Sequence, residues 1–360
     1  MTLNQLFTDI ANAIRAKKGT STKIVAENFP TEIADINTGN LTDEEYAEAN
    51  DDLDEILEGT TPITIYPPDW SEIGYENTPQ SIIDGFNYAQ EIQDNWDDSV
   101  TNLNSKFKDD KNLIFMPLVS TSNVTNMQSM FNGCTSLITI PQLNTSKVTD
   151  MRYMFQECES LTTIPLLNMS NVNYVAVMFR GCTNLTTIPL LDISNVASTQ
   201  QMFYDCTSLI TIPQLNTSKV TDMSNMFRGC TSLTTIPLLD TSGVTNMNSM
   251  FNNCANLTSI PQLDTSKVTS TTQMFMGCSS LTTVPLLNIS SATAIYGMFY
   301  NCNLLSNESL NNILQMCVNA TSYKGAKTLQ QLNLSQAQAT TCTTLSNYQA
   351  FLDAGWTTGY

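Results

Sequence analysis

The sequence predicts an α+β solenoid, a rod built by stacking copies of one short unit. Three residue patterns that recur every 24 residues predict it. A cysteine returns eight times, a proline returns from Pro117 to Pro285, and a Met-Phe pair returns from Met130-Phe131 to Met298-Phe299. A register of this length is the signature of a solenoid, in which each unit buries the apolar face of its neighbour. The cysteines of the register are Cys134, Cys158, Cys182, Cys206, Cys230, Cys254, Cys278 and Cys302.

Each unit is expected to combine a short parallel strand with a short helical turn. In residues 220–243, Leu233 and Ile236 bracket an extended stretch that a proline follows. Proline has no N–H for a ladder, so the strand should be about three or four residues long. An Asn or Asp before the next Ser predicts an Asx turn. Apolar residues from Val220 to Phe227 then fall at helical spacing and predict a helical turn.

The solenoid is predicted to span residues 96–308. Its first unit, 96–116, keeps the apolar positions but carries Lys106 and Asp110 where later units have Met and Cys. Such a polar unit suits the end of a solenoid, whose outer face no neighbour covers. Residues 309–360 are predicted to close the other end with helices, for which Ser306 and Ser335 are N-cap candidates.

The region before the solenoid divides into an attachment or oligomerisation segment, 1–40, and an acidic helical connector, 41–95. The connector should include a helix over 80–95. No apolar run reaches the ~18 residues of a membrane span, and no basic stretch precedes an apolar block as in a secretory signal. We therefore expect no membrane insertion and no secretion. The helical stripe of the first segment, the candidate virion-attachment face, consists of Leu3, Leu6, Phe7, Ile10 and Ile14.

Composition excludes several functions. The chain has 15 Lys+Arg, 33 Asp+Glu and no histidine. Catalysis by a Ser-His-Asp or Cys-His arrangement is impossible without histidine, and so acidic a chain is a poor partner for nucleic acid. Residues 1–112 hold 23 of the acidic residues, so the solenoid is nearly neutral. No repeat unit departs from the pattern to place a catalytic carboxylate pair. We expect a protein without enzymatic activity and without a cofactor.

The repeated cysteines invite metal and disulfide interpretations. One thiol in 24 residues lacks the paired spacing of zinc sites, and stacked cysteines would have parallel rather than converging Cβ atoms. We expect a reduced ladder packed in the core. The Asn/Asp column supplies about one ligand per unit, too few for calcium, so no metal site is predicted. Whether Cys317 and Cys342 form a disulfide is left open.

Two surfaces are candidates for recognition. On the strand side, a hydroxyl column is formed by Thr163, Thr187, Thr211 and Thr235. The β propensity of threonine explains this column equally well. On the other side, the position two residues before each cysteine varies most and includes Arg180, Tyr204 and Arg228. Exposed Tyr and Arg are typical interface anchors.

The repeated phrase from Met226 to Met247 resembles the BspA-type leucine-rich repeats of bacterial surface and phage proteins. The likeness extends over 96–308 and implies a β-lined, leucine-rich-repeat-like solenoid used in adhesion or recognition. Residues 1–40 resemble a segment at the head of phage tail-fibre and baseplate proteins. Its matching stretches are 10–15, 17–20 and 29–36.

These resemblances imply a phage virion protein assembled in the host cytoplasm, a receptor-binding subunit of a tail fibre or baseplate. Residues 1–40 would bind other virion proteins, and the solenoid would bind a bacterial surface glycan or protein. A homotrimer is expected by analogy with tail fibres. The alternatives are a bacterial surface adhesin and a capsid or tail decoration protein that binds no receptor.

Overall fold

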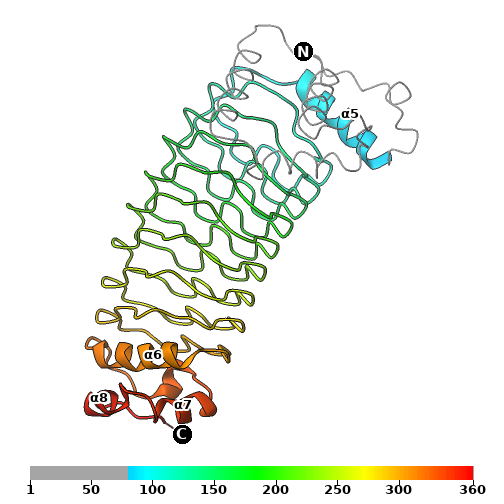
Figure 1. The fold of residues 1–360 in the computed structure, drawn as a ribbon. Coiled ribbons are helices and arrows are strands. Elements are labelled where there is room, and N and C mark those ends of the chain that lie inside the picture. Colours follow the sequence, from blue (N-terminus) through cyan, green and yellow to red (C-terminus); the bar gives the residue numbers. More distant parts are fainter. Residues whose placement is uncertain (1–79, 360) are drawn as a thin grey trace, which may run out of the picture.

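The computed structural model describes residues 80–359 as a rod of stacked coils with helices at its two ends (Figure 1). Each coil is one 24-residue unit of the repeat. Helix α5 (Gln80–Asp94) lies beside the first coils, which confirms the helix predicted there. The predicted stripe from Leu3 to Ile14 and the connector up to residue 79 lie outside the described residues. The far end holds α6 (Asn307–Asn319), η2 (Leu329–Leu332), α7 (Gln336–Cys342) and α8 (Tyr348–Asp353).

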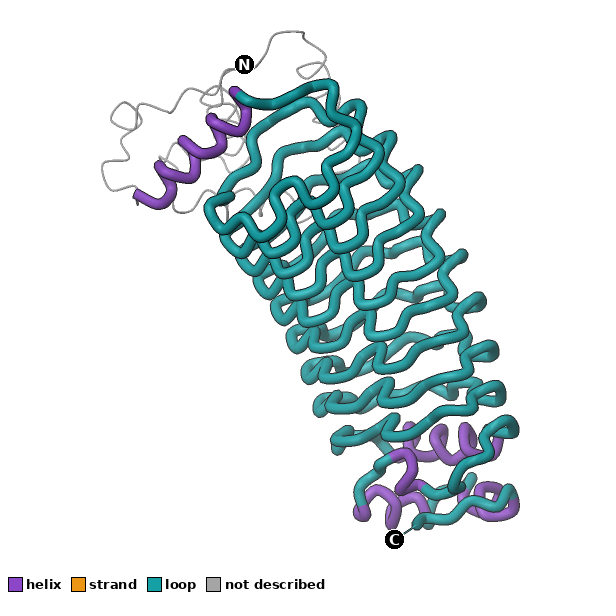
Figure 2. The backbone as a smooth tube through the Cα atoms, turned by 180° about the vertical axis from the view of Figure 1, so that it is seen from behind, coloured by secondary structure: helices purple, strands orange, loops and turns teal. Residues whose placement is uncertain are grey.

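The stacked coils differ from the expected strands. Between α5 and α6 the described chain contains single parallel bridges 24 residues apart, such as Phe115 with Thr139, and no longer strand (Figure 2). On the predicted strand side, Ser208 N–H donates to Thr183 O and Ile210 N–H donates to Thr186 O of the preceding coil. Pro213 follows and has no N–H, so pairing stops before a regular strand can form.

The predicted helical turn is also different, and we call the stretch that replaces it the turn ribbon (residues 222–230 and their equivalents). Met226 N–H donates to Met223 O within the coil, whereas Phe227 N–H donates to Met250 O of the next coil. An α-helix would direct every N–H to its own chain four residues back. Asn225 and Gly229 have φ of 56° and 77°, which a right-handed helix cannot include. The ribbon is a run of tight turns joined to the next coil.

The core is a set of continuous columns. Nine phenylalanines from Phe107 to Phe299 are stacked with 5.5–5.8 Å between neighbouring ring centroids. Each cysteine of the register is buried and free, and its thiol donates to the carbonyl of a phenylalanine one coil earlier, as from Cys230 to Phe203. Burial raises the pKa of Cys134 to about 12. Such thiols stay protonated and unreactive at neutral pH.

The C-terminal helices cover the last coil. The Oγ of Ser306 accepts the N–H of Ser309 at the start of α6, and Ser335 forms a capping box with Gln338 at the start of α7. Both predicted N-caps are therefore confirmed. Cys317 and Cys342 are buried and free.

At one position of the turn ribbon, the type of residue repeats every two coils and not every coil. One ribbon position has positive φ in every coil and alternates between glycine and a larger residue. A Cβ atom on Gly229 would overlap the Oδ1 of Asp205, because that side chain extends over the glycine of the next coil. The alternating residues are Asp109, Gly133, Glu157, Gly181, Asp205, Gly229, Asn253, Gly277 and Asn301.

Candidate recognition surface

The hydroxyl column of the strand side is only partly accessible. Thr211 and Thr235 are exposed and Thr187 is half-buried, but Thr163 is 5% exposed. Thr163 cannot contact a partner, which corrects its assignment as a binding residue.

Exposed leucines stand beside this column. They occupy the position before the inner leucine of each coil, where Leu190, Leu238 and Leu286 are exposed. Glutamines take the same position in other coils. The amide of Gln262 donates to Leu286 O of the next coil at 2.9 Å. This side therefore presents threonines, leucines and glutamines that are already engaged with the backbone.

The turn ribbon brings Arg180, Tyr204 and Arg228 together, and we call these three residues the arginine–tyrosine ladder. They occupy the same ribbon position in three successive coils. The guanidinium carbons of Arg180 and Arg228 lie 4.9 Å and 5.2 Å from the centroid of the Tyr204 ring. Both arginines therefore make cation–π contacts with one tyrosine. All three side chains are half-buried.

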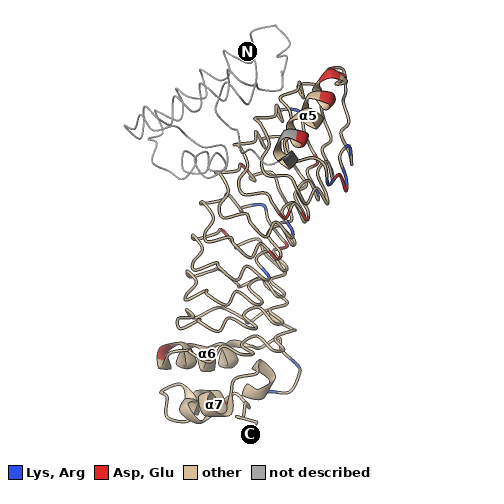
Figure 3. Ribbon diagram, turned by 90° about the vertical axis from the view of Figure 1, so that its right-hand side faces the viewer, with Lys and Arg blue, Asp and Glu red and all other residues tan. Residues whose placement is uncertain are grey.

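Acidic residues accompany the ladder. Asp205 follows Tyr204 in the chain, and partial burial raises the pKa of its carboxyl although Arg228 and Arg180 oppose the shift. Glu157 stands in the same relation to Arg180, because its side chain extends over Gly181 and its N–H donates to Arg180 O. Two carboxylates therefore balance the two arginines at neutral pH. Figure 3 shows that charged residues are sparse over most of the coil body.

A related group joins the first coil of the ladder, which holds Tyr174, to the coil before it. Arg152 Nε donates to Asp150 Oδ1 at 3.0 Å, and its guanidinium carbon lies 5.0 Å from the centroid of the Tyr174 ring. Tyr174 is 54% exposed. Arg152 and Tyr174 were not among the predicted binding residues, because they stand at other ribbon positions than the variable column. A signal was present in the sequence, since all three arginines of the solenoid fall on the ribbon.

The Asn/Asp column forms the predicted Asx turns rather than a ligand set. In each coil the side-chain oxygen accepts the N–H of the serine two residues later, as from Ser266 to Asp264 at 2.9 Å. In residues 80–359, no cluster of three or more acidic, cysteine or histidine residues is arranged to hold a metal ion.

These features define a leucine-rich-repeat-like solenoid whose coils are joined by turns and single bridges. The chain belongs to the DUF285 family, which is described as a Mycoplasma protein of unknown function and which matches residues 101–211 and 209–313. No curated protein matches the chain.

Solved structures of bacterial leucine-rich repeat proteins are similar to it. The Treponema pallidum protein TpLRR is 22% identical, with 56% of this chain and 81% of that one aligned and a TM-score of 0.37. A leucine-rich repeat protein of Eubacterium ventriosum is 22% identical over 54% of each chain, with a TM-score of 0.38. A leucine-rich cell surface protein of Faecalibacterium prausnitzii is 19% identical over 57% of this chain and 82% of that one, with a TM-score of 0.22.

One further property bears on location. No helix within the described part of the chain is both long enough and apolar enough to cross a bilayer.

Proposed function

We propose that the protein is a non-enzymatic recognition protein that binds a bacterial surface glycan or protein through the arginine–tyrosine ladder. The observation that carries the proposal is the position of Tyr204 between two guanidinium groups, at 4.9 Å and 5.2 Å. These contacts fix long side chains before a partner arrives, which lowers the entropy lost on binding. An arginine stacked on a ring keeps the N–H groups at its edge free for carboxylates or carbonyl oxygens.

The charge balance narrows the class of partner. The carboxylates of Asp205 and Glu157 lie beside the arginines of the ladder, and the rest of the coil body has few charges. Long-range electrostatic attraction between this surface and a charged partner should therefore contribute little to the binding energy. Shape and directed hydrogen bonds would select the partner, as at other interfaces centred on Tyr and Arg.

A mutational experiment tests the ladder. Wild-type protein and an Arg180→Ala/Arg228→Ala variant are incubated with a panel of bacterial cells and isolated cell envelopes, and bound protein is measured. Because two anchors are lost, we expect binding to fall at least tenfold. A Lys219→Ala/Lys267→Ala variant removes the same charge outside the turn ribbon and should bind normally. Equal binding by the ladder variant and the wild type would overturn the proposal.

The biological setting we favour is a phage tail fibre or baseplate, in which residues 1–40 attach a trimeric subunit to the virion. The resemblance of residues 1–40 to tail-fibre heads supports it. The resemblance of the repeats to the BspA-type repeats of bacterial surface proteins supports the alternative, a cell-surface adhesin. A decoration protein would bind no cell.

Localisation separates these settings. Antibody labelling at the tip of a tail supports the receptor-binding subunit, and labelling of a capsid surface supports decoration. Labelling of the envelope of intact cells that release no virions would replace the phage setting with the adhesin.

A further inference from the structure

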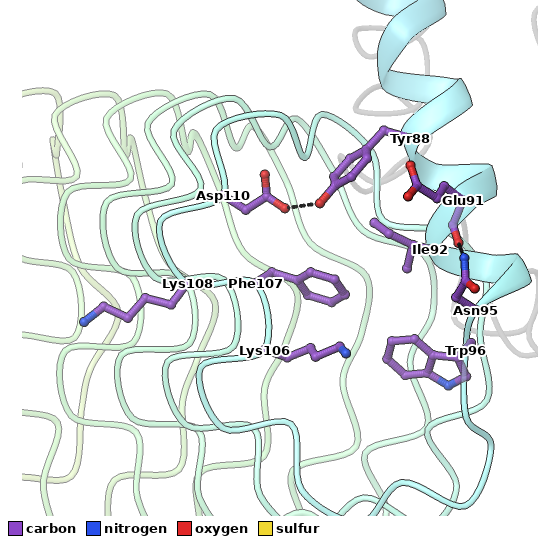
Figure 4. Close-up of a pocket in the computed structure, with 9 residues that line it drawn as sticks. All are labelled: Tyr88, Glu91, Ile92, Asn95, Trp96, Lys106, Phe107, Lys108 and Asp110. Atoms are coloured by element: carbon purple, nitrogen blue, oxygen red, sulfur yellow. Dashed lines mark hydrogen bonds between the residues drawn. The ribbon is translucent and has the colours of Figure 1, made fainter.

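A cleft of about 590 Å³ opens between α5 and the first coil, at the end of the rod opposite to α6–α8 (Figure 4). Tyr88, Ile92 and Trp96 line it from the helix and the residues after it, and Lys106 and Phe107 line it from the coil. Its volume lies in the range of sites for small molecules. The cleft is separate from the arginine–tyrosine ladder, and nothing in the proposed function uses it.

The aromatic walls of the cleft are held in place. The Tyr88 hydroxyl donates to Asp110 Oδ2 at 2.7 Å, and the Trp96 indole N–H donates to Ser120 O at 2.9 Å. The Trp96 ring is within 16° of parallel to the Phe107 ring, with 6.4 Å between centroids. Phe107 is in turn the first ring of the core stack. The cleft therefore exists before a ligand enters.

The polar groups of the cleft balance in charge. Lys106 and Lys108 carry positive charge and Glu91 and Asp110 carry negative charge. Glu91, Asn95 and Lys106 are exposed, so their polar ends can reach a ligand. The lining thus offers hydrogen-bond donors and acceptors next to aromatic rings without favouring an anion or a cation.

We propose that this cleft binds a neutral pyranose sugar. The C–H face of a pyranose ring is apolar and packs on aromatic rings, while its hydroxyls both donate and accept hydrogen bonds. Lys106 would donate to a sugar oxygen and Glu91 would accept from a hydroxyl, and hydrogen bonds to charged groups are the stronger kind. An anionic ligand would meet Glu91 and Asp110, and a purely apolar one would leave the charged groups without water.

Tryptophan fluorescence tests the proposal on the full chain. Trp96 lines the cleft and Trp356 is buried at the other end of the rod. The third tryptophan, Trp70, is replaced by phenylalanine in every protein of the test, so that an emission change reports on the cleft. The probes are the methyl glycosides of glucose, galactose, mannose and N-acetylglucosamine. We expect a saturable change of emission with at least one of them. Lys106→Ala and Glu91→Gln should each weaken that binding about tenfold.

A neighbouring lysine supplies the matched control. Lys111 belongs to the same coil and is exposed, but it does not line the cleft. Lys111→Ala should therefore bind the glycoside as the wild type does. No emission change with any of the four glycosides would overturn the proposal, and so would equal binding by Lys106→Ala and the wild type. Binding of methyl glucuronide or inorganic phosphate in place of the neutral sugars would also overturn it. The ladder proposal does not depend on any of these outcomes.

Discussion

The residue after the Asn/Asp column shows how much one hydroxyl matters in this core. Thr217 is buried and its Oγ1 donates to Asp240 O of the next coil at 2.8 Å. Ile193 and Ile289 occupy the same position in other coils and are equally buried. Thr241 is 2% exposed, yet its Oγ1 has no hydrogen-bond partner. A threonine at this position therefore has its hydrogen bond satisfied in one coil and unsatisfied in the next.

Replacing these threonines by valine should change stability in opposite directions. Thr241→Val removes an unsatisfied buried hydroxyl and should raise the free energy of unfolding by about 1 kcal/mol. Thr217→Val removes the donor to a carbonyl and should lower it by about 1 kcal/mol. Urea unfolding followed by circular dichroism measures both. Changes of the same sign in the two variants would show that the shape of the side chain, and not its hydrogen bond, decides the effect.

At the scale of the element, the Asx turns link stability to pH. Hydrogen bonds from Ser194, Ser242 and Ser266 lower the pKa of the Asp carboxyl at the start of each turn. A carboxyl whose folded pKa is lowered contributes stability above its unfolded pKa and loses it as the pH falls through the folded value. The carboxyls concerned are those of Asp192, Asp240 and Asp264.

A triple variant isolates this contribution. Asparagine forms the same turn in other coils, as where Ser218 N–H donates to Asn216 Oδ1 at 3.2 Å. Asp192→Asn/Asp240→Asn/Asp264→Asn should therefore fold normally but lose less stability than the wild type as the pH falls below about 4. Midpoints of urea unfolding between pH 7 and pH 3 measure the difference. Parallel pH profiles for the two proteins would contradict the expectation.

The elements also show which features can be predicted from sequence. Helices α6 and α7 were predicted because a cap is a local signal, a serine just before an apolar stripe. The turn ribbon was not, because apolar residues at spacings of three and four suit both a helix and consecutive turns. What decides between them is the bonding of every second N–H to the next coil, which no single unit displays.

The candidate surfaces also divide into features that one repeat unit displays and features that depend on contacts between distant parts of the chain. The column of Arg180, Tyr204 and Arg228 was found because position in the repeat is visible in the sequence. The burial of Thr163 was missed because its equivalents Thr211 and Thr235 are exposed, so its position in the repeat does not mark it. The cleft was missed because it forms only where α5 packs against the first coil.

At the scale of the whole molecule, the rod has two kinds of coil. Coils with a larger residue at the alternating position extend its side chain over the glycine of the next coil, as Asn253 does over Gly277. In a solenoid, stability is close to a sum of unit and nearest-neighbour contributions. Removal of one coil therefore brings two coils of the same kind into contact. Two neighbouring glycine coils and two neighbouring coils with a larger residue should differ in stability.

Two deletions of equal length make this difference measurable. Deleting 230–253 places Gly229 next to Gly277, which leaves space. Deleting 254–277 places Asn253 next to Asn301, so the Cβ of the second residue would overlap the amide of the first, as a Cβ on Gly277 would. Each protein loses one coil, but we expect the second deletion to be the less stable of the two. The difference should be smaller than the ~1–3 kcal/mol of overpacking in a core, because Asn253 is exposed and its amide can turn aside. Urea unfolding of both proteins gives the comparison.

The substitution Asn253→Gly shows whether the alternation itself causes that difference. In the full chain it exchanges one residue that tolerates positive φ for another and removes a side chain that has room over Gly277, so its effect should be small. In the protein lacking 254–277 the same substitution removes the overlap with Asn301. It should therefore stabilise that protein more than it stabilises the full chain. An equal effect in both backgrounds would mean that the coils adjust independently, and that the two-coil period is a feature of the sequence without energetic consequence.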